Sequence, residues 1–120
     1  MASILVVDDA IFMRKKLKSI LESVGHEVVA EANNGSKAVS AYKTYKPDLI
    51  TMDISMPNND GIGALEQIIN YDNKAKIIMI SSVQEKNIIV DAVIKGAKGY
   101  ILKPFSEEKI VETINEILEL

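Results

Sequence analysis

Five short runs rich in β-branched residues alternate along the chain with five segments of helical periodicity. A strict strand–helix alternation is typical of a parallel sheet with helices on both faces. The predicted strands are residues 3–8, 27–32, 48–53, 75–81 and 99–103. The alternation occupies the whole chain without a linker, a repeat or a low-complexity tract. We therefore predict one α/β domain over residues 1–120.

The helical segments follow from apolar residues that recur at three- and four-residue spacing. The residues predicted to face inward are Met13, Leu17, Ile20, Leu21, Val24, Ala38, Val39, Tyr42, Tyr45, Ala64, Leu65, Ile68, Ile69, Ile110, Val111, Ile114, Ile117 and Leu118. The fourth helix is predicted over residues 85–95. Gly25 and Gly96 provide stop signals after the first and fourth helices, and Ser106 is a cap for the fifth.

Composition excludes several classes of protein. The chain has no cysteine, so disulfides, thiolate metal sites and thiol catalysis are excluded. No apolar run reaches the roughly 18 residues that a membrane span needs, and no signal peptide is visible at the start. The net charge is −3 and the basic residues are interleaved with acidic ones, which argues against nucleic-acid binding. We expect a cytoplasmic protein that neither enters a membrane nor binds nucleic acid.

Polar residues gather where the predicted strands end, and that is where open parallel sheets bind ligands. The residues at these ends are Asp8 and Asp9 after the first strand, Asp53 after the third, Ser81 and Ser82 after the fourth, and Lys103 after the fifth. The second strand contributes no comparable group, as expected for an edge strand. The alternation therefore predicts that three carboxylates, a hydroxyl and an ammonium group converge.

Carboxylates crowded in this way repel one another, by roughly 4 kcal/mol per pair at 4 Å and an effective dielectric constant of 20. Oxygen-only ligands favour Mg²⁺, with Ca²⁺ a weaker candidate, as the relieving cation. The plainer alternative is that Asp9 caps the first helix and that Asp8 and Asp53 are solvated. Convergence with Lys103 favours a metal-assisted anion site over that alternative.

Phosphoryl transfer is the chemistry that these groups suit. Asp53 provides a carboxylate nucleophile, Asp8 and Asp9 hold the metal, and Ser81 and Lys103 contact the phosphoryl oxygens. Nucleotide-binding motifs are missing: no phosphate-binding loop has the required spacing, and "GIGALE" at 61–66 lacks the third glycine of a dinucleotide fingerprint. The single histidine, His26, is expected to be a solvated turn residue.

The segments "VVDDA", "LITMDISMP", "MISS" and "GYILKPF" resemble, in order and spacing, the receiver domain of two-component response regulators, in particular the single-domain chemotaxis regulators. The resemblance covers essentially the whole chain. It implies a flavodoxin-like (βα)5 fold with a doubly wound five-stranded parallel sheet in the order 2-1-3-4-5. It also implies that a sensor histidine kinase transfers a phosphoryl group from a phosphohistidine to Asp53.

The resemblance further implies roles for single residues. Magnesium would be bound by Asp9, Asp53 and the main-chain carbonyl of Ser55, with Asp8 acting largely through water. Lys103 would bridge the acceptor carboxylate and the phosphoryl group, and its peptide bond to Pro104 would be cis. The switch hydroxyl would be Ser81 and the switch aromatic residue Tyr100. Ser82 stands where the family often has alanine, which leaves the relative roles of the two serines open.

The fourth helix has more apolar surface than a core stripe requires. Its apolar residues span an arc of roughly 240°, whereas a stripe facing the core needs somewhat more than about 100°. A broadly buried helix is one interpretation. The other, which the resemblance favours, is an output surface for a partner, formed by Ile88, Val90, Ile94 and Tyr100. The basic run "RKKLK" at 14–18 is interpreted as a solvated helix surface, with docking of the kinase's phosphorylated domain as the alternative.

Together these observations predict a monomeric, phosphorylation-driven switch of the chemotaxis type, whose downstream partner is a protein such as the flagellar motor switch. It is not expected to be an enzyme, apart from self-phosphorylation by small phosphodonors and self-dephosphorylation. The final helix closes without a polar linker, which favours a free-standing regulator. Two alternatives remain: a receiver domain of a transcriptional or other multi-domain regulator, and a metal-dependent phosphohydrolase acting on small molecules.

Overall fold

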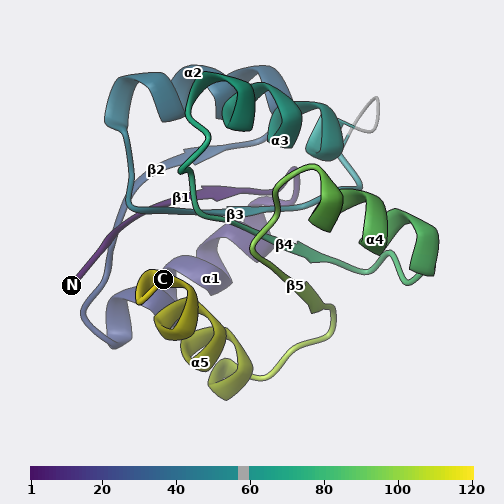
Figure 1. The fold of residues 1–120 in the computed structure, drawn as a ribbon. Coiled ribbons are helices and arrows are strands. Elements are labelled where there is room, and N and C mark those ends of the chain that lie inside the picture. The colour runs from purple at the N-terminus through teal and green to yellow at the C-terminus, as the bar shows by residue number, and fades with distance from the viewer. Residues whose placement is uncertain (57–59) are drawn as a thin grey trace.

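A five-stranded parallel sheet forms the centre of the computed structural model, which describes residues 1–56 and 60–120 (Figure 1). The strands are β1 (Ser3–Val7), β2 (Glu27–Ala32), β3 (Leu49–Met52), β4 (Ile77–Ser81) and β5 (Gly99–Leu102). Their order is β2-β1-β3-β4-β5, so the predicted order is confirmed and β2 is an edge strand. The central strands β1, β3 and β4 are almost completely buried, as expected for a sheet covered on both faces.

Five helices cover the two faces of the sheet. They are α1 (Ile11–Ser23), α2 (Gly35–Tyr45), α3 (Asp60–Tyr71), α4 (Lys86–Ile94) and α5 (Glu107–Leu118). Helices α1 and α5 lie on one face, and α2 and α3 lie on the other (Figure 1). Side chains alternate across each strand, so one core cluster joins α1 and α5 to the sheet and a second joins α2, α3 and α4 to it.

Local signals explain where several helices begin and end. Asn34 accepts a hydrogen bond from the Lys37 amide at the start of α2, and Ser106 accepts one from the Lys109 amide at the start of α5. Gly25 follows α1 with a φ of 93°, a value that L side chains rarely adopt. These signals fix where the three helices begin or end.

Two residues predicted to face inward are exposed at the ends of helices. Val24 is 46% exposed because it follows the last residue of α1, and Tyr45 is 54% exposed because it is the last residue of α2. Both lie beyond the point where the helix still covers the sheet.

The prediction that His26 is a solvated turn residue is wrong. His26 is half-buried: its Nδ1 accepts a hydrogen bond from the Ala2 amide, and its Nε2 lies 3.3 Å from Oδ1 of Asn115.

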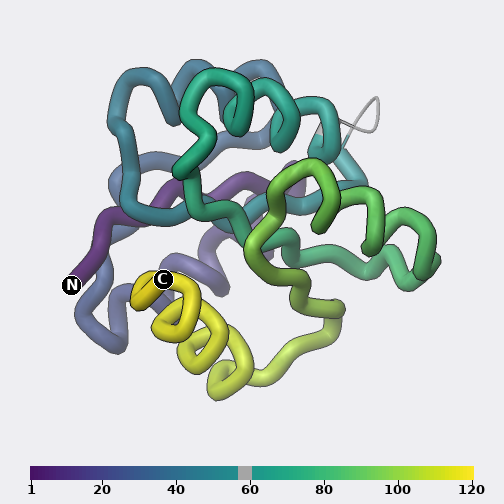
Figure 2. The backbone as a smooth tube through the Cα atoms, in the orientation of Figure 1, coloured from purple at the N-terminus to yellow at the C-terminus, as the bar shows by residue number. Residues whose placement is uncertain are grey.

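The two ends of the chain come to the same end of the domain (Figure 2). Met1 and Leu118 line one hollow, and the Lys76 ammonium donates to the main-chain carbonyls of Leu118 and Leu120. This is the amino-end side of the sheet. Across the described residues, no helix is both long enough and apolar enough to cross a membrane.

Candidate functional site

The acidic cluster lies at the carboxyl ends of β1 and β3. Asp8 and Asp9 follow β1 and Asp53 follows β3, and carboxylate oxygens of all three lie within 4.8 Å of one another. The two strands are neighbours, and the Asp53 amide donates to the carbonyl of Val7 at 3.0 Å. Pairing of β1 with β3 therefore brings together acids that are more than forty residues apart in the sequence.

Burial differs among the three acids. Asp8 is 2% exposed and Asp53 is 4% exposed, whereas Asp9 is exposed to solvent. Oδ1 of Asp8 accepts from the Ala10 amide at 2.9 Å, and Oδ1 of Asp53 accepts from the Ser55 amide at 3.1 Å. Each buried carboxylate is therefore held by the loop that follows it, while Asp9 opens the cluster to solvent.

Lys103 reaches the cluster from the end of β5. Its ammonium lies 2.8 Å from Oδ2 of Asp8 and 3.6 Å from Oδ2 of Asp53. The Lys103 amide donates to the carbonyl of Ser81 at 3.0 Å, and the peptide bond to Pro104 is cis. One lysine thus faces three carboxylates, so the cluster keeps an excess of negative charge.

This donor set fits a hard divalent cation. All the ligand atoms are oxygens, two carboxylates are fixed by backbone amides, and the third is accessible. The alternative in which Asp9 caps the first helix is wrong: the residue before α1 is Ala10, and no side chain makes a cap hydrogen bond there. Ser55 is exposed in the loop after β3, and coordination through its carbonyl stays a prediction.

The two serines at the end of β4 have different environments. Ser81 is fully buried and its Oγ accepts from the Val83 amide at 3.3 Å, whereas Ser82 is exposed. The hydroxyl of the half-buried Tyr100 donates to the carbonyl of Val83 at 2.7 Å. Burial raises the pKa of Tyr100, hydrogen bonding with Ser81 partly offsets this, and the charge of Asp53 adds to the rise. Val83 therefore connects the predicted switch hydroxyl to the predicted switch aromatic residue.

Helix α4 presents part of its apolar surface to solvent. Val90, Val93 and Ile94 are 45%, 53% and 77% exposed, while Ala92 is buried. Ile88, which was assigned to the output surface, is half-buried and packs against the core cluster on this face of the sheet. The helix has too much apolar surface for the sheet to cover, and Ile88 is on the covered side.

Sequence reasoning missed two residues that shape the site. Arg14, interpreted as part of a solvated basic run, donates through Nη1 to the main-chain carbonyl of Asp8 and through Nε to Glu31. Gly61, in the first turn of α3, lies against the loop after β3: a Cβ there would come within 2.2 Å of the Asp53 carbonyl oxygen. A glycine soon after Asp53 was the available signal for Gly61. The contacts of Arg14 had no signal in the sequence.

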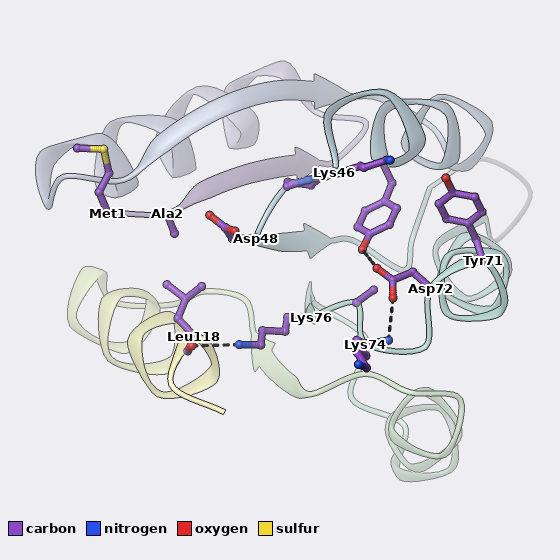
Figure 3. Close-up of a pocket in the computed structure, with 12 residues that line it drawn as sticks. Met1, Ala2, Lys46, Asp48, Tyr71, Asp72, Lys74, Lys76 and Leu118 are labelled. Carbon is purple, nitrogen blue, oxygen red and sulfur yellow. Dashed lines mark hydrogen bonds between the residues drawn. The ribbon is translucent and has the colours of Figure 1, made fainter.

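A wide hollow of about 920 Å³ lies at the other end of the sheet, away from Asp8, Asp9 and Asp53 (Figure 3). Lys46, Asp48, Asp72, Lys74 and Lys76 are among the residues that line it. Ion pairs and buried carboxylates of the kind seen at the carboxyl ends are lacking among these lining residues. Its size alone does not make it a reaction site. The motif "LITMDISMP" reaches Pro57, which lies outside the described residues.

Known proteins are similar to this chain in sequence and in fold. The model of the response regulator receiver domain matches residues 4–115. The chemotaxis protein CheY of Bacillus subtilis is 51% identical over 96% of each chain, and that of Thermotoga maritima is 46% identical over 95% of each. A CheY structure in a CheX-CheY-BeF3-Mg complex from Borrelia burgdorferi superposes with a TM-score of 0.93 at 37% identity, covering 96% of this chain and 87% of that one. The chain belongs to the response regulator receiver domain family.

Proposed function

We propose that this chain is a phosphorylation-driven switch in two-component signalling, of the kind used in chemotaxis. The observation that carries the proposal is the cluster of Asp8, Asp9 and Asp53 with the Lys103 ammonium directed at it. Similarity to CheY proteins over nearly their whole length supports the chemotaxis assignment. A histidine kinase is the phosphodonor and a protein of the flagellar motor switch type is the target. The chain acts as a cytoplasmic monomer.

Asp53 is the phosphoacceptor in this proposal. A carboxylate oxygen of Asp53 attacks phosphorus, the bond between phosphorus and the donor's imidazole nitrogen breaks, and its electron pair leaves with the imidazole. The Ser55 amide fixes Oδ1 of Asp53, and Lys103 already lies near Oδ2, where it can stabilise charge on the incoming phosphoryl oxygens. A bound Mg²⁺ would neutralise phosphoryl charge. Asp9 and Asp53 would hold it, together with the Ser55 carbonyl, and Asp8 would act largely through water.

The switch runs from the acceptor to α4 through Val83. Ser81 uses its Oγ as an acceptor for the Val83 amide, so its hydroxyl hydrogen can turn from the Tyr100 oxygen to a phosphoryl oxygen. A shift of Ser81 is passed to Val83, whose carbonyl also binds Tyr100. Residues Val90, Val93 and Ile94 then supply exposed apolar surface for the partner. Linked sites are commonly coupled by about 1–3 kcal/mol, which is the expected gain in partner binding.

Incubation with acetyl phosphate and Mg²⁺ tests the acceptor assignment. The expected product is one phosphoryl group on Asp53, located by borohydride reduction and peptide mass spectrometry. Asp53→Asn removes the nucleophile and should abolish labelling. Asp91→Asn in α4 is the matched control, because its carboxylate pairs with Lys95 away from the cluster, and it should label normally. Label on Ser81 or Ser82 would overturn the assignment.

The same experiment separates the switch from a phosphohydrolase. A switch consumes about one equivalent of phosphodonor for each adduct it forms, with only slow loss, whereas a hydrolase turns over many equivalents of a small substrate without an adduct. The structure supports the switch, because His26, the single histidine, contacts Ala2 at the amino end of β1, opposite to Asp8. The output step is tested by measuring the affinity of a target peptide for the chain with and without beryllofluoride. We expect tighter binding with it.

A further inference from the structure

Arg14 connects three parts of the molecule near the acidic cluster. It lies in the first turn of α1, and its amide donates to the carbonyl of Ala10. Its Nη1 donates to the main-chain carbonyl of Asp8 at 2.8 Å, and its Nε pairs with Oε1 of Glu31 on the edge strand β2 at 3.0 Å. The Arg14 side chain is only 14% exposed. It is therefore packed into the structure, unlike a solvated surface cation.

The carbonyl that Arg14 holds belongs to the peptide between Asp8 and Asp9. Because a peptide group is planar, fixing its carbonyl also fixes the direction of the Asp9 amide and hence the approach of the Asp9 backbone. The Asp8 amide is fixed separately by the carbonyl of Ala32. The Asp9 side chain itself has no hydrogen bond or ion pair within the part of the chain that the structure describes. The peptide on its amino side thus fixes the backbone position from which the Asp9 side chain extends.

We propose that Arg14, anchored by Glu31, is a positioning residue that holds the Asp8–Asp9 peptide so that both carboxylates face a divalent cation. The inference rests on the magnesium site of the proposed function and assigns a role to a residue outside that site. The planar guanidinium suits it, because two of its nitrogens donate in different directions to two acceptors at once. A lysine ammonium keeps the charge but lacks that rigid fork.

A simple charge effect predicts the opposite result, which makes the inference testable. A cation close to the cluster repels Mg²⁺, so a neutral residue at position 14 would strengthen metal binding if Arg14 acted only through its charge. If Arg14 positions the ligands, the same substitution weakens binding. Residues that orient metal ligands typically contribute about 10–100-fold in metal affinity.

The experiment is a titration of the ¹⁵N-labelled, metal-free chain with MgCl₂, followed by NMR. Parent, Arg14→Met, Arg14→Lys and Lys15→Met are compared. Lys15→Met removes the same charge from the next position of α1, where the side chain is exposed. We expect about tenfold weaker Mg²⁺ binding in both Arg14 variants and less than a twofold change in Lys15→Met.

A second measurement on the same samples needs no metal. The Ala10 amide donates to Oδ1 of Asp8, so its hydrogen exchange reports how firmly the loop is held. Exchange should be faster in Arg14→Met than in the parent, while the amides of β3 keep their protection if the fold is intact. Loss of β3 protection would mean that Arg14 stabilises the whole fold, and this would overturn the specific role.

The possible outcomes separate the two proposals. A parent that binds Mg²⁺ together with an Arg14→Met variant that binds equally or more tightly overturns the positioning role and leaves the proposed function standing. Normal binding by Arg14→Lys would show that the planar guanidinium is not needed to hold the peptide, which also overturns it. A parent that shows no Mg²⁺-dependent shifts overturns the metal site of the proposed function, and this inference with it.

Discussion

The two ends of the sheet carry the same kinds of residue, aspartate and lysine, in opposite arrangements. At the carboxyl ends, Asp8 and Asp53 are buried and Asp9 lies beside them, with Lys103 as the cation that pairs with two of the three. The negative charges outnumber the positive one in a partly dry environment. Such a cluster is stable only with further positive charge nearby or with strain.

At the amino ends, Asp48 and Asp72 accept hydrogen bonds from neutral donors, and Figure 3 shows those of Asp72. Asp48 accepts from the amide and the hydroxyl of Ser3, and Asp72 accepts from the Tyr42 hydroxyl at 2.6 Å and from the Lys74 amide at 3.0 Å. The acids here are not crowded together. Because Asp48 and Asp72 are separate and each accepts hydrogen bonds from neutral donors, neither requires a metal ion to offset repulsion.

The difference indicates that charge balance, more than the size of a hollow, marks the end of the sheet at which we propose the phosphoryl chemistry. The wide hollow lies at the amino ends of the strands, whereas phosphoryl transfer is expected at the carboxyl ends, where negative charge is in excess. At the amino end, Lys76, next to β4, holds the carbonyls of Leu118 and Leu120 against the sheet. The substitutions below should therefore change phosphorylation only at the carboxyl end, whereas at the amino end they should change stability alone.

The largest effect is expected from Gly61→Ala at the carboxyl end. An added Cβ would overlap the Asp53 carbonyl oxygen and the Ile54 Cα, and both are backbone atoms that cannot move aside cheaply. We expect a loss of about 2–3 kcal/mol in the free energy of unfolding, and slower phosphorylation because the acceptor loop shifts. Urea denaturation and acetyl phosphate labelling measure the two effects.

Gly63→Ala in the same helix is the control. A Cβ at position 63 meets nothing within 4 Å, so this variant should gain up to about 1 kcal/mol from the better helix propensity of alanine. Equal effects of the two substitutions would show that the close approach of α3 to the acceptor loop is not what requires glycine at position 61.

Tyr42→Phe tests the amino end of the sheet and should have a smaller effect on stability than Gly61→Ala. It removes the hydrogen bond to Asp72, which is partly exposed, so we expect a loss of about 1 kcal/mol near neutral pH. Phosphorylation of Asp53 should not change. A large loss of phosphorylation would contradict the separation of the two ends.

The same pair gives a pH dependence with a definite sign. The Tyr42 hydrogen bond, followed by the Lys74 amide, lowers the pKa of Asp72, so its contribution is present above the unfolded pKa near 3.9 and is lost as pH falls through the folded value. Burial and then the Asp72 hydrogen bond raise the pKa of Tyr42, so its contribution is lost as pH rises above about 10. The stability difference between parent and Tyr42→Phe should shrink in both ranges, as measured by urea denaturation across pH.

Thr51→Val, in the middle of β3, should have the smallest effect. Oγ1 of Thr51 is buried and has no hydrogen-bond partner among the described residues. Replacing the hydroxyl by a methyl group of similar shape removes an unsatisfied polar atom, so we expect no loss and a gain of up to about 1 kcal/mol. A loss beyond that size in urea denaturation would show that the hydroxyl has a partner, such as a buried water.

Local patterns in the sequence were enough to predict the strands, their polar ends and the convergence of the acids. The β-branched runs indicate burial directly, and the β1–β3 pairing, which the resemblance implied, brings Asp8 and Asp53 together. Periodicity could not assign Val24 and Tyr45 correctly, because it cannot show where the sheet stops covering a helix. It also could not separate Ile88 from Ile94 on α4.

Contacts between distant residues were beyond sequence reasoning. Arg14 forms an ion pair with Glu31, which is seventeen residues away in the sequence. Neither residue type indicates this partner. The same holds for His26 and Asn115, which are 89 residues apart. Burial separates Ser81 from Ser82, because side chains alternate at the end of β4 and only Ser81 points into the protein, but the role of Ser81 as the switch hydroxyl stays a prediction.

Thermal unfolding with and without millimolar Mg²⁺ tests the central claim most directly. A cation that binds the folded state alone stabilises it by about 1.4 kcal/mol at ten times its dissociation constant, which corresponds to a rise of several degrees in Tm. We predict this rise for the parent and little or none for Asp9→Asn, which keeps the fold but removes the exposed carboxylate of the cluster. Identical Tm values for the parent with and without Mg²⁺ would contradict the account.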